Sequence, residues 1–222
     1  MIEIDGSEGE GGGQVVRNSC ALSLVTGQPF RITNVRGRRE KPGLMRQHVT
    51  AIEAACRIGA ACEGVTVGSS EIMFTPGKVV AGDYHFAVGT AGSTSLVLQT
   101  VLMPLLGADG PSRLVLEGGT HNMMAPPFEF LSRAFLPVLG RMGAQVSARL
   151  LRHGFYPRGG GRIEVEIVPG ALAPIDGTDR GMLKSVSATA LLAALTFDIA
   201  EREIRTASKL LPDWPDDAFA VR

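Results

Sequence analysis

The sequence predicts an α/β (α+β) fold made of repeated βαβαββ units, and three observations predict it. The chain repeats itself, because the letters RIGA at Arg57–Ala60 return as RMGA at Arg141–Ala144, an offset of 84 residues. Each copy alternates short apolar stretches with longer segments of helical apolar spacing. The segment Arg162–Ile167 alternates polar and apolar side chains, as a half-buried strand does.

The first copy, about residues 1–80, opens with a short apolar strand, a glycine-rich turn and a helix. Val15, Cys20 and Leu24 fall near one face of that helix. A second helix is expected to start near Pro42, because a proline at a helix start gives up an N–H that has no partner there. The expected elements are strand Ile2–Ile4, helix Gln14–Val25, strand Phe30–Val35, helix Pro42–Ile58, strand Gly64–Val67 and strand Glu71–Phe74.

The second copy, about residues 81–170, repeats this order and is about nine residues longer before its closing turn. The extra length matches the stretch His153–Gly161, which reads as an insertion. The expected elements are strand His85–Val88, helix Ser93–Leu106, strand Arg113–Glu117, helix Pro127–Met142, strand Gln145–Leu151 and strand Gly161–Val168.

A third unit begins after the core of residues 1–181. Within residues 182–222 we expect a strand at Lys184–Leu191 and a helix at Phe197–Leu211, the helix with a Glu- and Arg-rich outer face. A polar segment follows, at residues 212–217. A unit that begins in this way and then stops is expected to be truncated.

The composition is that of a globular protein. Of the 222 residues, 45% are hydrophobic and 20% are charged, which excludes a disordered chain. The 22 basic residues balance 22 acidic ones, so any contact with a polyanion must come from local clustering. No apolar run reaches the roughly 18 residues that a bilayer crossing needs, and the acidic, glycine-rich N-terminus lacks the basic and apolar regions of a signal peptide.

Cysteine usage favours a reducing, cytoplasmic compartment. The three cysteines, Cys20, Cys56 and Cys62, form no CxxC pair, and their number is odd. We therefore expect neither a disulfide framework nor a zinc site.

The first candidate site is the stretch Gly9–Gln14, with the letters GEGGGQ, followed by Arg17. Glycines just before a helix let backbone N–H groups approach an anion, and the helix dipole adds to the attraction. Glu10 beside such a loop could hold a hydrated divalent metal. No GK[ST] follows, so this is not a P-loop. The alternative is a flexible glycine turn with a solvated glutamate.

The second candidate is a basic run that enters the second helix. Five positive charges stand against one acid over eleven residues, and Pro42-Gly43 breaks the run into a loop. Guanidinium groups suit bidentate phosphate contact, and such a patch suits an RNA end. The alternative is an ordinary solvated face. The charged residues are Arg36, Arg38, Arg39, Glu40, Lys41 and Arg46.

Two further motifs and one glutamine complete the candidates. Gly118–Asn122, followed by Ala125–Pro127, would make a pocket rim with a stiff wall for a flat base, or else a tight turn before a helix. Arg152–Arg162 would bring its glycines close to a ligand, or else form a bulged hairpin in which His153 is structural. Gln99 interrupts an apolar helix, so we expect it to be buried and to pair with backbone groups or with a ligand.

In this order the motifs resemble those of the RNA 3′-terminal phosphate cyclases. The matching stretches are EGEGGGQ with the arginine after it, KPGLMRQH, AGSTSLVLQT, GGT-x-N-x-x-APP and HGFYPRGGG, and they extend from residue 2 to about residue 205. The resemblance implies repeated βαβαββ units like those in the C-terminal domain of a translation initiation factor. It also implies a smaller α/β domain inserted late in the chain, of which residues 182–222 would be the start.

The resemblance implies a ligase-class, RNA-processing enzyme that uses ATP. In such an enzyme a histidine attacks the α-phosphate of ATP, and the adenylate then moves to the 3′-phosphate of RNA. The neighbouring 2′-hydroxyl attacks that phosphate, which gives a 2′,3′-cyclic end and releases AMP. Magnesium (or manganese) and arginines would offset the build-up of negative charge.

The resemblance also assigns roles to single residues. Glu10 corresponds to a metal-associated carboxylate, and Gln99 and Pro126 complete the ATP-binding set with it. His121 stands where relatives often carry an acidic residue, so its role stays open. The RNA- and phosphate-binding set is Arg17, Arg36, Arg39, Lys41, Arg46 and Gln47.

The nucleophilic histidine of the family has no counterpart in this sequence. None of the four histidines matches its position, so we predict no catalytic residue and expect these 222 residues to be incomplete for catalysis. One reading is a fragment of an active cyclase, and the other is a non-catalytic RNA-binding relative of the ribosome-assembly kind. An enolpyruvyl-transferase-like enzyme ranks last, because that class shares the repeat architecture but not HGFYPRGGG.

The expected partners are ATP and an RNA with a 3′-phosphate end, with no membrane. A homodimer is also expected, because missing C-terminal strands would leave apolar surface exposed.

Overall fold

The computed structural model describes residues 1–222 and divides them into two compact units, Met1–Ile175 and Asp176–Arg222. The first unit holds two four-stranded sheets with helices packed against them, and the second holds a pair of short strands and one helix. None of the helices combines the length and the apolar character that a membrane crossing needs.

The first copy folds as one βαβαββ unit. Its sheet has the order β1-β2-β4-β3, in which β1 and β2 are parallel and the remaining pairs are antiparallel. The rings of Phe30 and Phe74 stack across the sheet with their centroids 5.0 Å apart. The elements are β1 (Ile2–Asp5), α1 (Gly13–Thr26), β2 (Phe30–Thr33), α2 (Arg46–Gly59), β3 (Ala60–Glu63) and β4 (Ile72–Pro76).

The second copy forms a sheet with the equivalent order, β5-β6-β8-β7, in which β5 and β6 are parallel. The same strand order in both sheets confirms the predicted α/β fold of repeated units. The elements are β5 (Asp83–Ala87), α3 (Thr94–Leu106), β6 (Ser112–Gly118), α4 (Phe128–Phe130), a π-helical turn (Leu131–Phe135), α5 (Leu136–Arg141), β7 (Gln145–Arg152) and β8 (Gly161–Val168).

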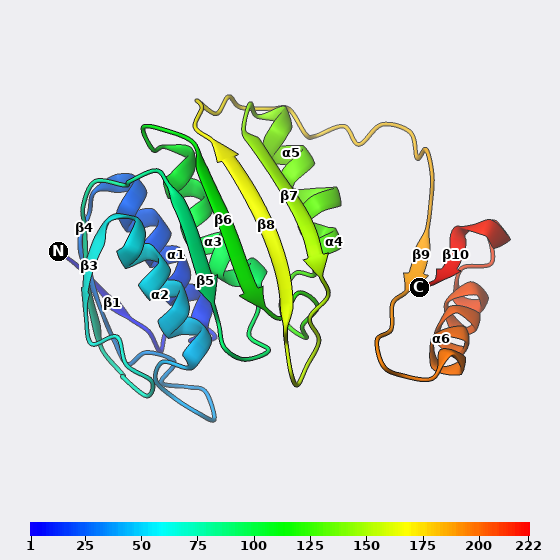
Figure 1. Cartoon of the computed structure of the whole chain (residues 1–222), viewed down its shortest axis with the longest axis horizontal. Helices are drawn as coiled ribbons and strands as arrows, with labels where there is room; N and C mark the ends of the chain where they lie inside the picture. The colour runs from blue at the N-terminus through cyan, green and yellow to red at the C-terminus, as the bar shows by residue number, and fades with distance from the viewer. The chain divides into compact units, whose positions relative to one another are not determined.

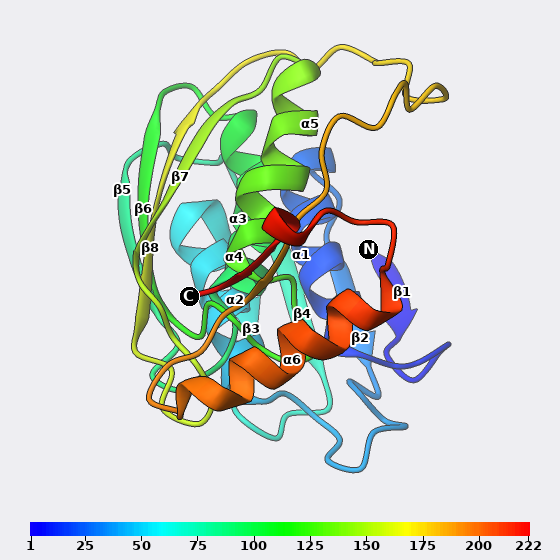
Figure 2. The ribbon, with the colours of Figure 1, turned by 90° about the vertical axis from the view of Figure 1, so that its right-hand side faces the viewer.

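The core of the first unit lies between its two sheets. Figures 1 and 2 show α1, α2 and α3 packed together with one sheet on either side. The apolar face of α3 is fully buried, with Leu98, Val101 and Leu105 at 1% exposure or less. Most residues of α3 are apolar and buried, so the helix forms the centre of the layer, and only Gln99 and Met103 of its residues are exposed.

Two boundaries in the first copy differ from the sequence prediction. Helix α2 begins at Arg46, not at Pro42, because residues 42–45 run as a loop whose N–H groups bond outside a helix. The Gly43 N–H donates to the Val35 carbonyl at 2.8 Å, and Gly43 has a φ of +80°. The strand expected at Gly64–Val67 is a turn, since Gly64 has a φ of +74°, and β3 lies four residues earlier.

The expectation of no disulfide is wrong, because Cys56 and Cys62 are joined by one. Cys56 lies in the last turn of α2, and Cys62 lies on β3, which starts directly after that helix. The chain reverses at Gly59, where φ is +145°, and this brings the two Cα atoms to 6.5 Å. Cys20 is free and buried in the core.

The helix expected at Pro127–Met142 is present but interrupted. A π-helical turn at Leu131–Phe135 separates α4 from α5. Pro137 lies in the first turn of α5 and has no N–H to donate to a carbonyl one turn earlier, so the regular hydrogen-bond ladder cannot continue there.

The second unit is a small βαβ arrangement. The strand expected at Lys184–Leu191 is confined to β9 (Ala188–Ala190), and the expected helix is α6 (Phe197–Leu210). The polar segment before the end of the chain contains a 3₁₀ turn (Asp216–Ala218) and leads into β10 (Phe219–Val221), which pairs with β9 in parallel.

Candidate functional site

The predicted motifs lie in loops at one edge of the first unit. The loops after β1, β2, β5 and β6 leave from the carboxyl ends of parallel strands. Strand β7 is antiparallel to β8, which is antiparallel to β6, so the loop after β7 starts at the same edge as the loop after β6. Figure 1 shows all of these loops along the lower edge of the view. Open α/β sheets usually bind their ligands at this edge.

Glycine is required at position 13, where α1 begins. The imidazole Nε2 of His48 lies where the Cβ of any other residue would stand, and an Nη atom of Arg17 lies 3.1 Å from the same point. The preceding loop uses the left-handed region at Gly9 and Gly11, with φ of +57° and +53°. The N-terminal end of α1 is therefore in contact with two basic side chains.

Arg17 is a buried cation whose hydrogen-bonding partner is neutral. Its residue exposure is 7%, and its Nε donates to Oε1 of Gln99 at 3.2 Å. Burial lowers the pKa of Arg17. Gln99 is exposed on α3, contrary to the expectation of a buried residue, and its Nε2 donates to Oδ1 of Asn18 at 3.3 Å. A charge held away from water without a counter-ion is costly, and an anionic ligand would offset that cost.

His48 is a buried, neutral neighbour of Arg17. Its Nδ1 accepts a hydrogen bond from the Met45 N–H at 3.0 Å, so the ring proton lies on Nε2, the atom that faces Gly13. Burial, together with the nearby charges of Arg36 and Arg17, lowers the pKa of His48 to about 4. At neutral pH this side chain is a neutral donor at the start of α1.

The basic loop between β2 and α2 divides into two parts. Nη2 of Arg39 lies 3.3 Å from Oε2 of Glu10, so Arg39 reaches the glycine-rich loop. Arg36 instead donates from Nη1 to two carbonyls of its own loop, at 2.7 and 2.8 Å, and so holds the shape of that loop. Lys41 and Arg46 are exposed. Arg39 and Glu10 are therefore the charged pair nearest the start of α1.

Gln47 connects α2 to the start of α3. Its Oε1 accepts a hydrogen bond from the N–H of Ser93 at 2.9 Å, and Ser93 is the N-cap residue of α3. An open hollow of about 410 Å³ lies beside this contact. Residues that line it include Gln47, Thr90, Ser93, Asn122, Met124 and Tyr156.

Pro126 is connected to the same helix. Oγ of Ser95 donates to the Pro126 carbonyl at 2.7 Å. Ser95 and Gln99 are four residues apart on α3 and so share a face. Contacts therefore join Arg17 to Gln99 and, along α3, join Gln99 to the loop of Pro126. The roles assigned to these residues stay predictions.

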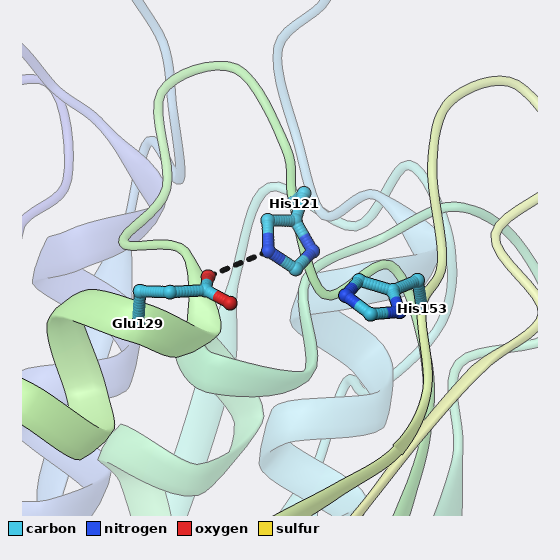
Figure 3. Close-up of side chains that lie close together, drawn as sticks. All are labelled: His121, Glu129 and His153. Carbon is cyan, nitrogen blue, oxygen red and sulfur yellow. Dashed lines mark hydrogen bonds and ion pairs between the residues drawn. The ribbon is translucent and has the colours of Figure 1, made fainter. Parts of the chain in front are cut away.

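Sequence reasoning missed a cluster of His121, Glu129 and His153, shown in Figure 3. His121 follows β6, Glu129 lies in α4, and His153 follows β7. One donor atom from each side chain lies within 4.8 Å of the other two. Nε2 of His121 is 2.6 Å from Oε2 of Glu129. The two histidines lie in separate sequence motifs, and no fixed spacing in the chain signals that Glu129 faces them.

The charge of Glu129 is stabilised within this cluster. Burial raises the pKa of Glu129, but hydrogen bonds from the backbone and from His121, together with the charges of His121 and His153, outweigh it, so the net pKa is lowered. The side chain of Glu129 is 39% exposed and that of His121 is 13% exposed. The cluster is thus a partly open site with an anionic oxygen and two imidazole rings.

Comparison with known proteins places these features in one family. A family model described as RNA 3′-terminal phosphate cyclase matches residues 8–211. Among curated relatives, an RNA 3′-terminal phosphate cyclase of Ectopseudomonas mendocina (strain ymp) is 53% identical over 220 residues, which is 99% of this chain and 64% of the relative. A protein of the same name from Koribacter versatilis (strain Ellin345) is 53% identical over 218 residues, which is 97% of this chain and 61% of the relative. The chain spans about three-fifths of the length of these relatives.

Among solved structures, the enolpyruvyl transferase NikO from Streptomyces tendae matches 82% of this chain and 33% of its own. The sequence identity is 17% and the TM-score is 0.40.

Proposed function

Because the chain belongs to the RNA 3′-terminal phosphate cyclase family, we propose that it contributes RNA-end and nucleotide binding to an ATP-dependent RNA-processing reaction. In that reaction an RNA 3′-phosphate becomes a 2′,3′-cyclic phosphate through adenylylated intermediates, with AMP as the leaving group. The residues proposed to hold the RNA end are Arg17, Arg36, Arg39, Lys41, Arg46 and Gln47.

The buried guanidinium of Arg17 is the observation that carries this proposal. It lies at the amino-terminal end of α1, its hydrogen-bonding partner is a neutral amide, and the Nε2–H of His48 is directed at the same helix start. Helix N-termini, guanidinium groups and backbone N–H groups together favour a phosphate. Arg39 adds a second cation that reaches the glycine-rich loop.

We propose that ATP contacts Gln99 and Pro126 and that Glu10 holds a divalent ion, Mg²⁺ or Mn²⁺. The face of α3 that carries Gln99 also carries the contact to Pro126, which supports one ligand touching both. Magnesium in nucleotide sites is commonly held by one or two carboxylates plus the substrate phosphates. A single exposed carboxylate such as that of Glu10 fits this role, and the bound ion would polarise phosphate oxygens.

The proposal is tested by comparing RNA ends. A fluorescent oligoribonucleotide with a 3′-phosphate is expected to bind more tightly than the same RNA with a 3′-hydroxyl, as measured by anisotropy. Arg39→Ala should remove most of this preference, with an affinity loss of about tenfold for the phosphate end. Arg31→Ala is the matched control, because Arg31 is a half-buried residue of β2 that pairs with Glu71. Equal binding of the two RNAs would contradict the proposal.

A second experiment addresses the covalent step. The chain is incubated with ATP labelled at the α-phosphate and with Mg²⁺, and protein-bound label is measured after denaturing electrophoresis. We expect no label, because none of its histidines matches the family's nucleophile. Label would mean that one of these histidines, or a lysine, forms the adenylate. A longer chain from the same gene, where one exists, is the positive control.

We also propose a cytoplasmic location, where ATP and RNA ends are both available. In that compartment the Cys56–Cys62 disulfide would face reducing conditions.

A homodimer is part of the same proposal. It is supported by β7, which ends its sheet as an edge strand and exposes Leu151. Light scattering coupled to size exclusion would test it, and a monodisperse monomer at high protein concentration would exclude it.

A further inference from the structure

We propose that His121, Glu129 and His153 form a binding site for a divalent transition-metal ion of the Zn²⁺ type. This site shares no residue with the set proposed above for ATP, RNA and Mg²⁺, and it does not depend on that function. Its three donor groups come from three separate elements, and one donor atom of each lies within 4.8 Å of the other two. In Figure 3 a ring nitrogen of His153 points toward the gap beside His121 and Glu129.

The chemistry of the donors selects the class of ion. Two imidazoles and one carboxylate suit zinc and its first-row neighbours, whereas magnesium and calcium prefer oxygen ligands alone. Zinc with three protein ligands of this kind keeps a further position for water. Ligand atoms about 2.0–2.2 Å from a tetrahedral ion lie roughly 3.4 Å from one another. Side-chain rotations that move the donor atoms by about 1 Å would therefore bring this cluster to that geometry.

The short contact between His121 and Glu129 marks where the ion would sit. Nε2 and Oε2 are 2.6 Å apart, and a proton between them holds the pair together. A metal ion would take the place of that proton and draw the two atoms around itself.

The hydroxyl of the buried residue Thr120 can pair with Nδ1 of His121 whether or not that nitrogen carries the ring proton. Oγ1 of Thr120 lies 2.8 Å from Nδ1 of His121, accepts the Gly154 N–H at 2.9 Å and lies 3.4 Å from the Gly154 carbonyl. Without metal the hydroxyl donates to Nδ1, and Nε2–H donates to Glu129. With metal on Nε2, Nδ1–H donates to the hydroxyl, which turns to the carbonyl. Partners of this kind orient metal-bound histidines.

Ring stacking holds the second imidazole in place. The centroids of His121 and His153 are 5.3 Å apart, and Phe155 stacks on both, at 5.2 and 6.1 Å. A backbone bridge between His121 and Phe155 joins the two loops directly. His153 is exposed, which leaves the ion open to water.

The test is titration of the tag-free 222-residue chain with Zn²⁺ and with Co²⁺. Calorimetry is expected to give one Zn²⁺ per chain, and Co²⁺ should give the visible absorption of a four- or five-coordinate site with nitrogen and oxygen ligands. Glu129→Gln and His153→Asn should each weaken binding about tenfold or more.

The matched control is His85→Asn. His85 also lies beside a glutamate, with Nε2 3.3 Å from Glu117, but no third ligand joins that pair. This variant should bind Zn²⁺ as the parent does. Circular dichroism shows whether each variant is folded, and His153→Asn alters an exposed side chain, so it keeps the test valid if Glu129→Gln unfolds.

Three results with the parent and the ligand variants would overturn the proposal. They are the absence of saturable binding, equal affinity in the parent and in His153→Asn, and a thiolate-to-cobalt charge-transfer band. The last would assign the metal to Cys56 and Cys62 in their reduced form. Loss of binding in His85→Asn as large as in His153→Asn would count against the site in the same way.

Discussion

Acidification should destabilise the first unit through His48. The ordinary pKa of a histidine is 6.5, and that of His48 in the folded chain is about 4. Between these values the unfolded chain binds a proton that the folded chain does not. The free energy of unfolding therefore rises with pH across this window and falls as the pH is lowered from 6.5 to 4. The full loss from this residue is roughly 3 kcal/mol.

The assay is urea unfolding at several pH values between 4 and 7.5, on the parent and on His48→Asn. The asparagine Oδ1 can accept the Met45 N–H in place of the imidazole Nδ1, and it does not titrate. We expect the parent to lose about 3 kcal/mol more than the variant between pH 7 and pH 4. His85→Asn removes an exposed histidine from the other sheet and controls for the loss of a histidine as such.

The choice of probe matters because the chain has two units. Trp214, the one tryptophan, lies in the second unit, so its fluorescence follows that unit. Far-ultraviolet circular dichroism follows mainly the first unit, which contains His48. The extra pH dependence should therefore appear in the dichroism curves. Parallel curves for the parent and His48→Asn would refute the reasoning.

Three further changes have defined outcomes. Gly13→Ala should destabilise the first unit by about 1–3 kcal/mol in urea unfolding and weaken RNA binding, because its Cβ would meet the His48 imidazole. Leu98→Ala should cost about 2–5 kcal/mol, measured by thermal and urea unfolding, since this side chain is 1% exposed at the centre of α3; an effect below 1 kcal/mol would contradict the packing described. Reduction of the Cys56–Cys62 disulfide should cost about 2 kcal/mol, and Cys62→Ser should make the chain insensitive to reductant.

The alternation of strands and helices could be predicted because it depends on local hydrophobic periodicity. Strands β2, β6 and β8 have apolar side chains at every second position, a spacing that an extended backbone places on one buried face. The duplication also predicted that the strand order would repeat, because two copies of one pattern imply two sheets of the same topology. These features need only near neighbours in the sequence.

Other features depend on contacts that no local pattern contains. The start of α2 was predicted too early because Pro42 is a good first helical residue, yet Gly43 bonds to Val35 and keeps the segment in a loop. The disulfide was not predicted, because it depends on a chain reversal at Gly59. Gln99 was expected to be buried because its neighbours are apolar, but it lies on the exposed side of α3, against Arg17.

The candidate site also contains residues that local motifs predict and residues that only the fold brings together. Arg17, Arg39 and Glu10 could be selected from the glycine-rich and basic motifs. The grouping of Glu129 with two histidines could not, because α4 and the ends of β6 and β7 are brought together only by the sheet.

The hydrogen bond between Arg17 and Gln99 joins residues 82 positions apart, one from each copy of the duplicated unit. A ligand that touches both side chains would act as a clamp across the two copies. By linkage its binding energy would be added to the free energy that holds them together. Ligand concentration would then set how often the copies separate, and slowed hydrogen exchange in α1 and α3 would measure that effect directly.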